Sequence, residues 1–286
     1  MKFYVSSAFL QAGEIIEIAK AADELGYQGI AIPDHVVNLE TLTTPYPYTP
    51  DGKRRWQPFT DWLDPWVLVG ALSQVTTRLK FITTVYIPAM RDPYSAAKAI
   101  GTAACLSGGR VELGIGVGWC EEEFALLGQP FARRGKRTDE MLDLFKALWQ
   151  PGWTEFEGEF YRTPRLEMTP TPPPIPIYSG GLSDIALRRA ARNDGWIGDL
   201  IGLDQAIASV DRVRELRAGK GLSMDGFRVI TPLNDAFLPE HYQRAEEGGI
   251  DAVLTMPWMF YSGPDASLAD KIDGMHRFRE DLGLDS

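Results

Sequence analysis

The chain has 286 residues, of which 44% are hydrophobic and 24% charged, and its formal net charge is -10. These values are typical of a soluble globular protein, with one large α/β domain or two small ones. The negative charge argues against nucleic acid or an anionic membrane as the main partner, because both attract basic surfaces. The first residues lack the apolar core of a signal peptide, and no run reaches membrane-spanning length, so we expect a cytoplasmic protein.

Apolar periodicity predicts strands and helices in strict alternation along the chain. The expected strands cover residues 2–9, 27–35, 80–88, 110–119, 175–181, 195–201, 227–234 and 251–257. The expected helices cover residues 14–25, 64–77, 93–106, 133–149, 183–192, 203–219, 239–248 and 265–280. Two segments rich in proline and aromatic residues, 36–64 and 150–174, are predicted to be irregular insertions.

Eight strands that alternate with eight helices predict parallel pairing with right-handed crossovers. In a chain of this length, eight such units indicate a closed (β/α)8 TIM barrel, and we expect one domain over residues 1–286. The active site of such a barrel lies at the C-terminal ends of its strands. On this topology Asp34, Gly198 and Asp199 are candidate cofactor contacts.

A glycine-rich stretch, GGRVELGIGVGW, covers residues 108–119. Alternate glycines remove the side chains from one face of a strand, so that a backbone or a planar ligand can approach it. A dinucleotide-binding fingerprint would need its third glycine at position 119, where tryptophan stands. We therefore interpret the stretch as a buried strand that ends at the mouth of a site.

Among the three histidines, His35 is the candidate for catalysis, because it ends a predicted strand and can move a proton near neutral pH. The alternative is a histidine that only holds the following loop. His241 and His276 fall on outer helices. One strand-end histidine is too few for a hydrolytic metal site, so no metal is expected. No lysine stands at a strand end to form the Schiff base of an aldolase.

The turn Ser179-Gly180-Gly181-Leu182-Ser183 joins a predicted strand to a helix. Its glycines allow backbone amides to face an anion, and the start of the helix adds partial positive charge. A phosphate group is the natural ligand, with Ser183 as helix cap. The alternative is an ordinary glycine turn with a serine cap. Arg133, Arg134, Lys136 and Arg137 are interpreted as the solvated start of a helix.

Residues 80–198 resemble the luciferase-like monooxygenase superfamily of flavin and deazaflavin barrels. The resemblance rests on the segments SGGRVELGIGVGW, ARRGKRTDEMLDLFKALW and IPIYSGGLSDIALRRAARNDGW. The mid-length chain is most similar to the branch that uses coenzyme F420, an 8-hydroxy-5-deazaflavin. This resemblance implies an oxidoreductase with F420 bound across the barrel mouth, and relatives that are commonly homodimers.

The resemblance also assigns residues to the cofactor. Thr84 and Val85 match a kink of the third strand, often with a non-proline cis peptide, that lies against the ring. Gly116 and Gly118 match glycines that let the ring and its side chain pass. The phosphate loop of the branch corresponds to Ser179, Gly180 and Gly181. His35 matches a histidine with acid/base or intermediate-stabilising work in sugar-phosphate dehydrogenases.

The sequence departs from those dehydrogenases at Trp119, where they carry a glutamate acid. Glu122 is the candidate to replace it, and a glucose-phosphate substrate is not expected. Trp119 is expected to line the substrate side, with Trp56, Trp62 and Trp258 as further apolar walls. Two alternatives stay open: an FMN-dependent monooxygenase that uses oxygen, and a barrel that binds a flavin without turnover.

Overall fold

The computed structural model describes residues 1–283 and contains a closed barrel of eight parallel strands. Around the barrel the strand order is β1-β10-β9-β8-β7-β4-β3-β2, so each strand lies beside its neighbour in the alternating sequence. The predicted TIM barrel is confirmed. The barrel strands are β1 Lys2–Ser6, β2 Gly29–Ile32, β3 Lys80–Thr83, β4 Val111–Ile115, β7 Ile177–Gly180, β8 Gly195–Ile197, β9 Arg228–Thr231 and β10 Ala252–Thr255.

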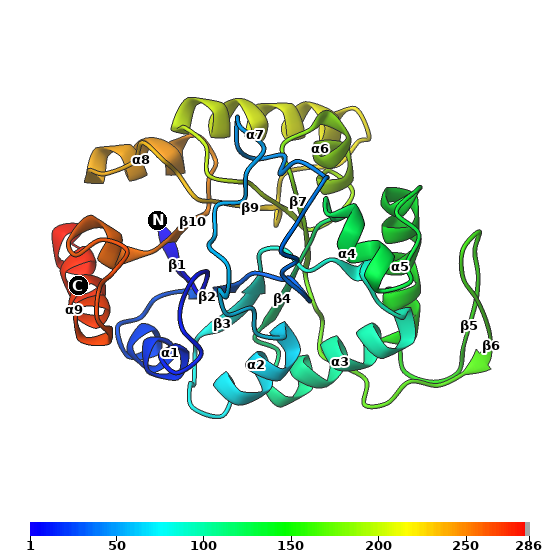
Figure 1. Cartoon of the computed structure of the whole chain (residues 1–286). Helices are drawn as coiled ribbons and strands as arrows, with labels where there is room; N and C mark the ends of the chain where they lie inside the picture. Colours follow the sequence, from blue (N-terminus) through cyan, green and yellow to red (C-terminus); the bar gives the residue numbers. More distant parts are fainter. Residues whose placement is uncertain (284–286) are drawn as a thin grey trace.

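Helices surround the barrel, and Figure 1 shows them as an outer ring with the strands inside. They are α1 Ile15–Glu24, α2 Pro65–Leu72, α3 Pro93–Leu106, α4 Glu121–Leu126, α5 Arg134–Leu148, α6 Asp184–Ala190, α7 Leu203–Ala218, α8 Pro239–Glu247 and α9 Leu268–Asp281. Two short 3-10 helices, η1 Pro88–Met90 and η2 Pro257–Phe260, follow β3 and β10. The helices α2, α3, α6 and α9 begin at a side chain that caps them. Asp64, for example, accepts hydrogen bonds from the amides of Trp66 and Val67.

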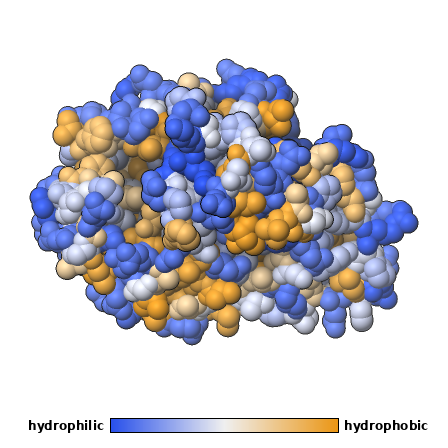
Figure 2. All heavy atoms as spheres, in the orientation of Figure 1, coloured by the Kyte–Doolittle hydropathy of each residue, from blue (hydrophilic) through white to orange (hydrophobic). Residues whose placement is uncertain are grey.

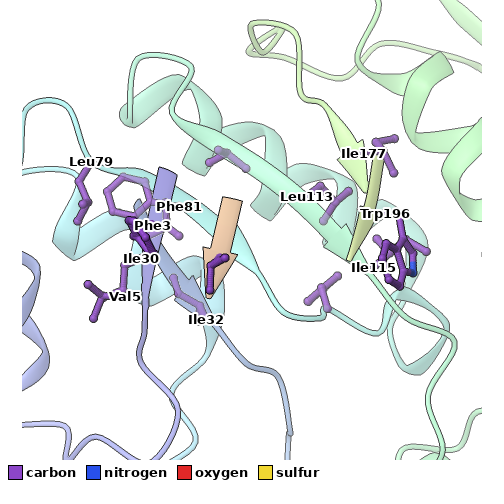
Figure 3. Packing of buried hydrophobic residues seen from close by; sticks show 14 of the residues in the cluster. Phe3, Val5, Ile30, Ile32, Leu79, Phe81, Leu113, Ile115, Ile177 and Trp196 are labelled. Carbon is purple, nitrogen blue, oxygen red and sulfur yellow. The ribbon is translucent and has the colours of Figure 1, made fainter. Parts of the chain in front are cut away.

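Successive residues of each strand face opposite sides, and both sides are buried. One set, including Phe3, Ile30 and Leu113, packs outward against the helices, and Figure 3 shows these side chains on β1, β2 and β4. The other set, including Tyr4 and Ile82, fills the inside of the barrel. The barrel is therefore a packed core, and a ligand can enter only at its end.

Several predicted boundaries are wrong, because the strands end earlier than the apolar runs do. The third strand was expected to reach residue 88, but β3 ends at Thr83 and the chain then turns through Thr84 to η1. Tyr86 keeps a single bridge to Ile115. The helix α4 was not predicted. It starts with three glutamates, which the positive end of a helix favours.

The insertion expected to be irregular over 150–174 contains an antiparallel hairpin instead. Its strands are β5 Thr154–Glu157 and β6 Arg162–Leu166, which project from the barrel beside α5 (Figure 1). The residues of β5 alternate between exposed and half-buried, a period that the crowding of proline and aromatic residues obscured.

The start of α5 is not entirely solvated, contrary to the prediction. Arg137 is buried and donates a hydrogen bond to the carbonyl of Ala89 at 3.0 Å. Arg134 donates to the carbonyl of Gly118 at 2.8 Å. Both side chains thus tie α5 to loops at the barrel mouth, while Arg133 and Lys136 are exposed.

Candidate active site

A cavity of about 600 Å³ opens at the C-terminal ends of the barrel strands. This is the position that the fold predicts for an active site, and the size is that of a small-molecule site. Ten of the predicted site residues line it: Asp34, His35, Thr84, Val85, Gly118, Trp119, Gly180, Gly181, Gly198 and Asp199. The four others, Gly116, Glu122, Ser179 and Ser183, do not.

His35 follows β2 and is held by a glutamate of α4. Its Nδ1 lies 3.0 Å from Oε2 of Glu123, whose other oxygen accepts the amides of Val36 and Val37. Because a carboxylate only accepts hydrogen bonds, Nδ1 carries the proton and Nε2 is left available in the cavity. Burial disfavours the charge on Glu123, but the bonds from His35 and the two amides hold the pKa of this carboxyl below its ordinary range.

Aromatic rings enclose the imidazole of His35. The ring centroids of Trp56, Trp62 and Trp119 lie 4.9, 4.8 and 6.1 Å from that of His35. Tyr46 packs against Trp119 at 5.1 Å. These rings leave the side chain of His35 only 15% exposed, in largely apolar surroundings.

Asp34 stands beside His35 but is used within the protein. Its two oxygens accept from both terminal nitrogens of Arg91, at 2.6 and 2.7 Å, and from the amide of Ile87 at 2.9 Å. Burial raises the pKa of Asp34, against the opposing effect of the Arg91 guanidinium. The predicted contact between Asp34 and a cofactor remains a prediction. In the structure, Asp34 fixes the segment after β3.

That segment projects Val85 into the cavity, and the glycines of neighbouring strands make room for it. A Cβ on Gly116 would lie 2.6 Å from Cγ2 of Val85, and a Cβ on Gly180 would lie 2.7 Å from its Cγ1. The peptide between Thr84 and Val85 is cis, as the resemblance implies. Gly116, which directly follows β4, thus receives Val85, whereas direct approach of a ring to Gly116 was expected.

The turn after β7 offers backbone amides at the start of α6. The amides of residues 182–185 have no hydrogen-bond partner among residues 1–283, and Ser183 caps the helix through the amide of Ala186. Ser179 points away from the cavity and its hydroxyl accepts from Asn193. The amide of Gly181 already donates a hydrogen bond to the carbonyl of Ile197. An anion here would be bound by the backbone after Gly181, and not by the Ser179 hydroxyl.

Glu122 does not reach the cavity. Its carboxylate accepts from the amide and hydroxyl of Thr43, both at 2.6 Å, and from the amide of Thr44 at 2.9 Å. Although desolvation opposes ionisation, these bonds hold the pKa of Glu122 well below its ordinary range. Glu122 fixes the 36–64 insertion, and Glu123 is the glutamate in contact with His35.

The 36–64 insertion crosses the barrel mouth, where Figure 1 shows it in blue in front of the strands. Arg55 joins it to the opposite wall, with Nη1 and Nη2 at 2.8 and 3.0 Å from the two oxygens of Asp199. In Figure 2, hydrophilic residues run down the middle of this face and hydrophobic residues gather beside them. The insertion forms part of the cavity wall through Trp56 and Trp62.

Among residues 1–283, no group of three or more His, Cys, Asp or Glu side chains is arranged to hold a metal ion. No helix in that range is long and apolar enough to cross a membrane.

A model of the family described as luciferase-like monooxygenase matches residues 4–237. The chain belongs to this family. The predicted family and the prediction of an oxidoreductase are both confirmed.

Curated luciferase-like relatives match along most of the chain. An uncharacterized protein of Mycobacterium tuberculosis is 40% identical over 99% of both chains. An F420-dependent glucose-6-phosphate dehydrogenase of Segniliparus rotundus is 28% identical over 95% of this chain and 85% of its own.

Solved luciferase-like structures share the fold. An F420-dependent secondary alcohol dehydrogenase superimposes with a TM-score of 0.77 at 15% identity, covering 99% of each chain. The monooxygenase RslO1 from Streptomyces bottropensis gives 0.75 at 18% identity, again over 99% of each chain.

Sequence reasoning missed the partners of the predicted residues. Glu123, Arg91 and Arg55 each bind a predicted site residue from a distant part of the chain. The signal for Glu123 was the run of three acids after the glycine strand, but its spacing alone did not tell which acid faces the cavity. Lys271 also lines the cavity and comes from α9, far from any motif.

Proposed function

We propose that the chain is an F420-dependent oxidoreductase that transfers a hydride between the deazaflavin and a small organic substrate. One observation carries the proposal. His35, held by Glu123 with Nε2 free, faces an apolar cavity that extends to the turn at Gly180 and Gly181. The cavity therefore joins a proton-handling group to a backbone site suited to a phosphate.

The residues present fit a phosphate-bearing tricyclic cofactor. The amides of residues 182–185 are available to a phosphate, and the partial charge of a helix start adds to them. Val85, seated over Gly116 and Gly180, presents an apolar surface to a ring. When bound, the deazaflavin supplies a carbon that accepts or gives a hydride.

The chain itself supplies the proton and a dry space. Nε2 of His35 accepts the proton of a substrate hydroxyl in oxidation and returns it to a carbonyl oxygen in reduction. Glu123 holds the imidazole in the orientation and tautomer for this exchange. Trp56, Trp62 and Trp119 exclude water around the ring of His35.

The choice of F420 is supported by curated relatives that are named F420-dependent and match 95% and 68% of the chain. FMN is the alternative cofactor, because it also presents a phosphate and a tricyclic ring, and it would make the protein a monooxygenase that uses reduced flavin and oxygen.

Titration of the purified protein with oxidised F420, reduced F420 and FMN tests the proposal. We expect F420 to bind at micromolar concentration, with a change in deazaflavin fluorescence, and FMN to bind at least about tenfold more weakly. Tight binding of FMN without binding of F420 would establish the monooxygenase instead. If neither binds, the proposed function is wrong.

A further inference from the structure

The cations that line the cavity are already neutralised inside the protein. Both terminal nitrogens of Arg55 donate hydrogen bonds to the carboxylate of Asp199. Nζ of Lys271 lies 2.8 Å from each oxygen of Glu14. The pair of Lys271 and Glu14 is mostly buried, with side-chain exposures of 9% and 15%, whereas the pair of Arg55 and Asp199 is more accessible, with 28% and 23%. In the described part of the cavity wall, no lysine or arginine is without a carboxylate partner.

The remaining charged groups of the wall are carboxylates. Asp34 accepts hydrogen bonds from Arg91 and from the amide of Ile87. Glu123 accepts them from His35 and from the amides of Val36 and Val37. An anionic substrate would therefore meet neutralised cations and fixed carboxylates. To pair with a lysine or arginine of the wall it would have to displace Asp199 or Glu14, and that would leave a partly buried carboxylate unpaired.

Most of the rest of the wall is apolar, although the hydroxyls of Ser6, Thr84 and Thr255 belong to it. Its large side chains include Trp56, Trp62, Trp119, Leu254, Met256 and Trp258. Such a wall favours the burial of a substrate body without charge. Nε2 of His35 is left as the imidazole nitrogen that can accept the proton of a substrate hydroxyl.

We propose that the substrate is a neutral, apolar alcohol or its carbonyl counterpart, and that Asp199 and Glu14 are specificity residues that exclude anions. This inference rests on the proposed function. In the oxidation, the carbinol C–H bond breaks and its hydride passes to oxidised deazaflavin, while the O–H proton passes to Nε2 of His35. The products are the carbonyl compound and reduced deazaflavin. The proposal sets this cavity apart from that of the curated relative named for glucose 6-phosphate, an anion.

Two ligands that share one body and differ in charge test the proposal: cyclohexanol and cyclohexyl phosphate. Their affinities are measured in the presence of saturating F420, so that the amides proposed for its phosphate are occupied, by quenching of tryptophan fluorescence, since four tryptophans line the cavity. We expect the wild-type protein to bind cyclohexanol at least about tenfold more tightly than the phosphate ester. Equal affinity, or a preference for the ester, would overturn the proposal.

Asp199→Asn frees Arg55 and is expected to improve binding of the phosphate ester at least about fivefold, with little change for cyclohexanol. Glu14→Gln frees Lys271 and tests the same point on an independent pair, should the first variant fold poorly. The matched control is Asp204→Asn. It removes an exposed carboxylate of α7 that pairs with Arg244 of α8. It changes the net charge equally and should leave both affinities unchanged. If neither cavity variant alters the ratio of affinities, the specificity role is wrong.

Deazaflavin titration separates this proposal from the proposed function. If F420 binds and the phosphate ester is preferred, the substrate class fails and the function stands. If F420 does not bind, the function fails, and the affinities of the two ligands, then measured without F420, decide whether the cavity rejects anions. With F420 bound, reduction of F420 by cyclohexanol but not by glucose 6-phosphate is the expected result.

Discussion

At the scale of single residues, three consecutive glutamates after the glycine strand have three different environments. Glu121 is exposed, Glu122 binds Thr43 and Thr44, and Glu123 binds His35. The position of His35 at the barrel mouth could be predicted from the sequence, because it closely follows the end of a barrel strand. The partner could not, because it lies 88 residues away on a short helix whose direction decides which acid faces inward.

The contact between Glu123 and His35 predicts the tautomer of the imidazole. In Glu123→Gln the amide oxygen can keep the bond from Val36, and the NH2 group then faces Nδ1 of His35. Nδ1 must accept, so the proton moves to Nε2. We expect 15N NMR of the ring to show protonated Nδ1 in the wild-type protein and protonated Nε2 in the variant. Turnover should fall roughly a hundredfold, because Nε2 no longer accepts the substrate proton.

His35→Ala is the reference for that experiment. It identifies the His35 signals among the three histidines, and it should abolish most turnover while the affinity for F420 stays nearly unchanged. The same ring tautomer in the wild-type protein and in Glu123→Gln would contradict the positioning role of Glu123. Unchanged turnover in His35→Ala would remove the proton-transfer role of His35.

At the scale of elements, β4 was predicted correctly as a buried strand at the mouth of the site, but its glycines have another neighbour than expected. Gly116, directly after β4, packs against the segment that follows β3, and Cγ2 of Val85 occupies the space where a Cβ of residue 116 would lie. The sequence pattern shows that something approaches the strand closely. It does not distinguish a side chain of the same protein from a ligand, because both need the same absence of Cβ.

Gly116→Ala tests the role of this close packing. The new Cβ would lie 2.6 Å from Cγ2 of Val85 and 3.0 Å from Cδ1 of Ile87, so both side chains must shift. We expect a loss of roughly 1–3 kcal/mol in the free energy of unfolding, measured by urea denaturation. Because Val85 presents the surface proposed to contact the ring, the affinity for F420 should fall as well.

The matched control is Gly70→Ala in α2, where a Cβ meets nothing within 4 Å. Here the free energy of unfolding should rise by roughly 0.5–1 kcal/mol, because a helix-interior glycine loses more backbone entropy than alanine does. A Gly116→Ala protein with wild-type stability and wild-type affinity for F420 would show that Val85 does not depend on the glycine.

At the scale of the whole molecule, the barrel could be predicted from the sequence because its signal is repeated eight times. Errors in single boundaries, such as the early end of β3, do not change the count. The insertions carry no such repetition. The bond of Arg55 to Asp199 joins residues 144 positions apart, and the two members have no common motif. The arrangement of the 36–64 insertion therefore depends on tertiary contacts that periodicity does not contain.

The same kind of long-range contact predicts how the molecule responds to acid. Asp23, near the end of α1, accepts the amides of Thr77, Arg78 and Leu79 at 2.7–2.8 Å and so fixes the approach to β3. Burial disfavours its charge, yet these amides hold the pKa of Asp23 below its ordinary range in the folded state. Its contribution to stability is therefore complete above the pKa of an unfolded aspartate and is lost as the pH falls through the lower, folded value.

Asp23→Asn should lower the free energy of unfolding by roughly 2 kcal/mol at neutral pH, because the bonds to a charged acceptor are replaced. Between about pH 7 and about pH 3, the stability of the variant should fall less steeply than that of the wild-type protein, so that the two urea-unfolding curves converge in acid. The exposed residue Asp265 gives the control, since Asp265→Asn makes the same chemical change without these amides and should keep the wild-type slope. A constant difference between wild type and Asp23→Asn over the whole range would mean that Asp23 stabilises the fold by packing, and that its charge has no part in it.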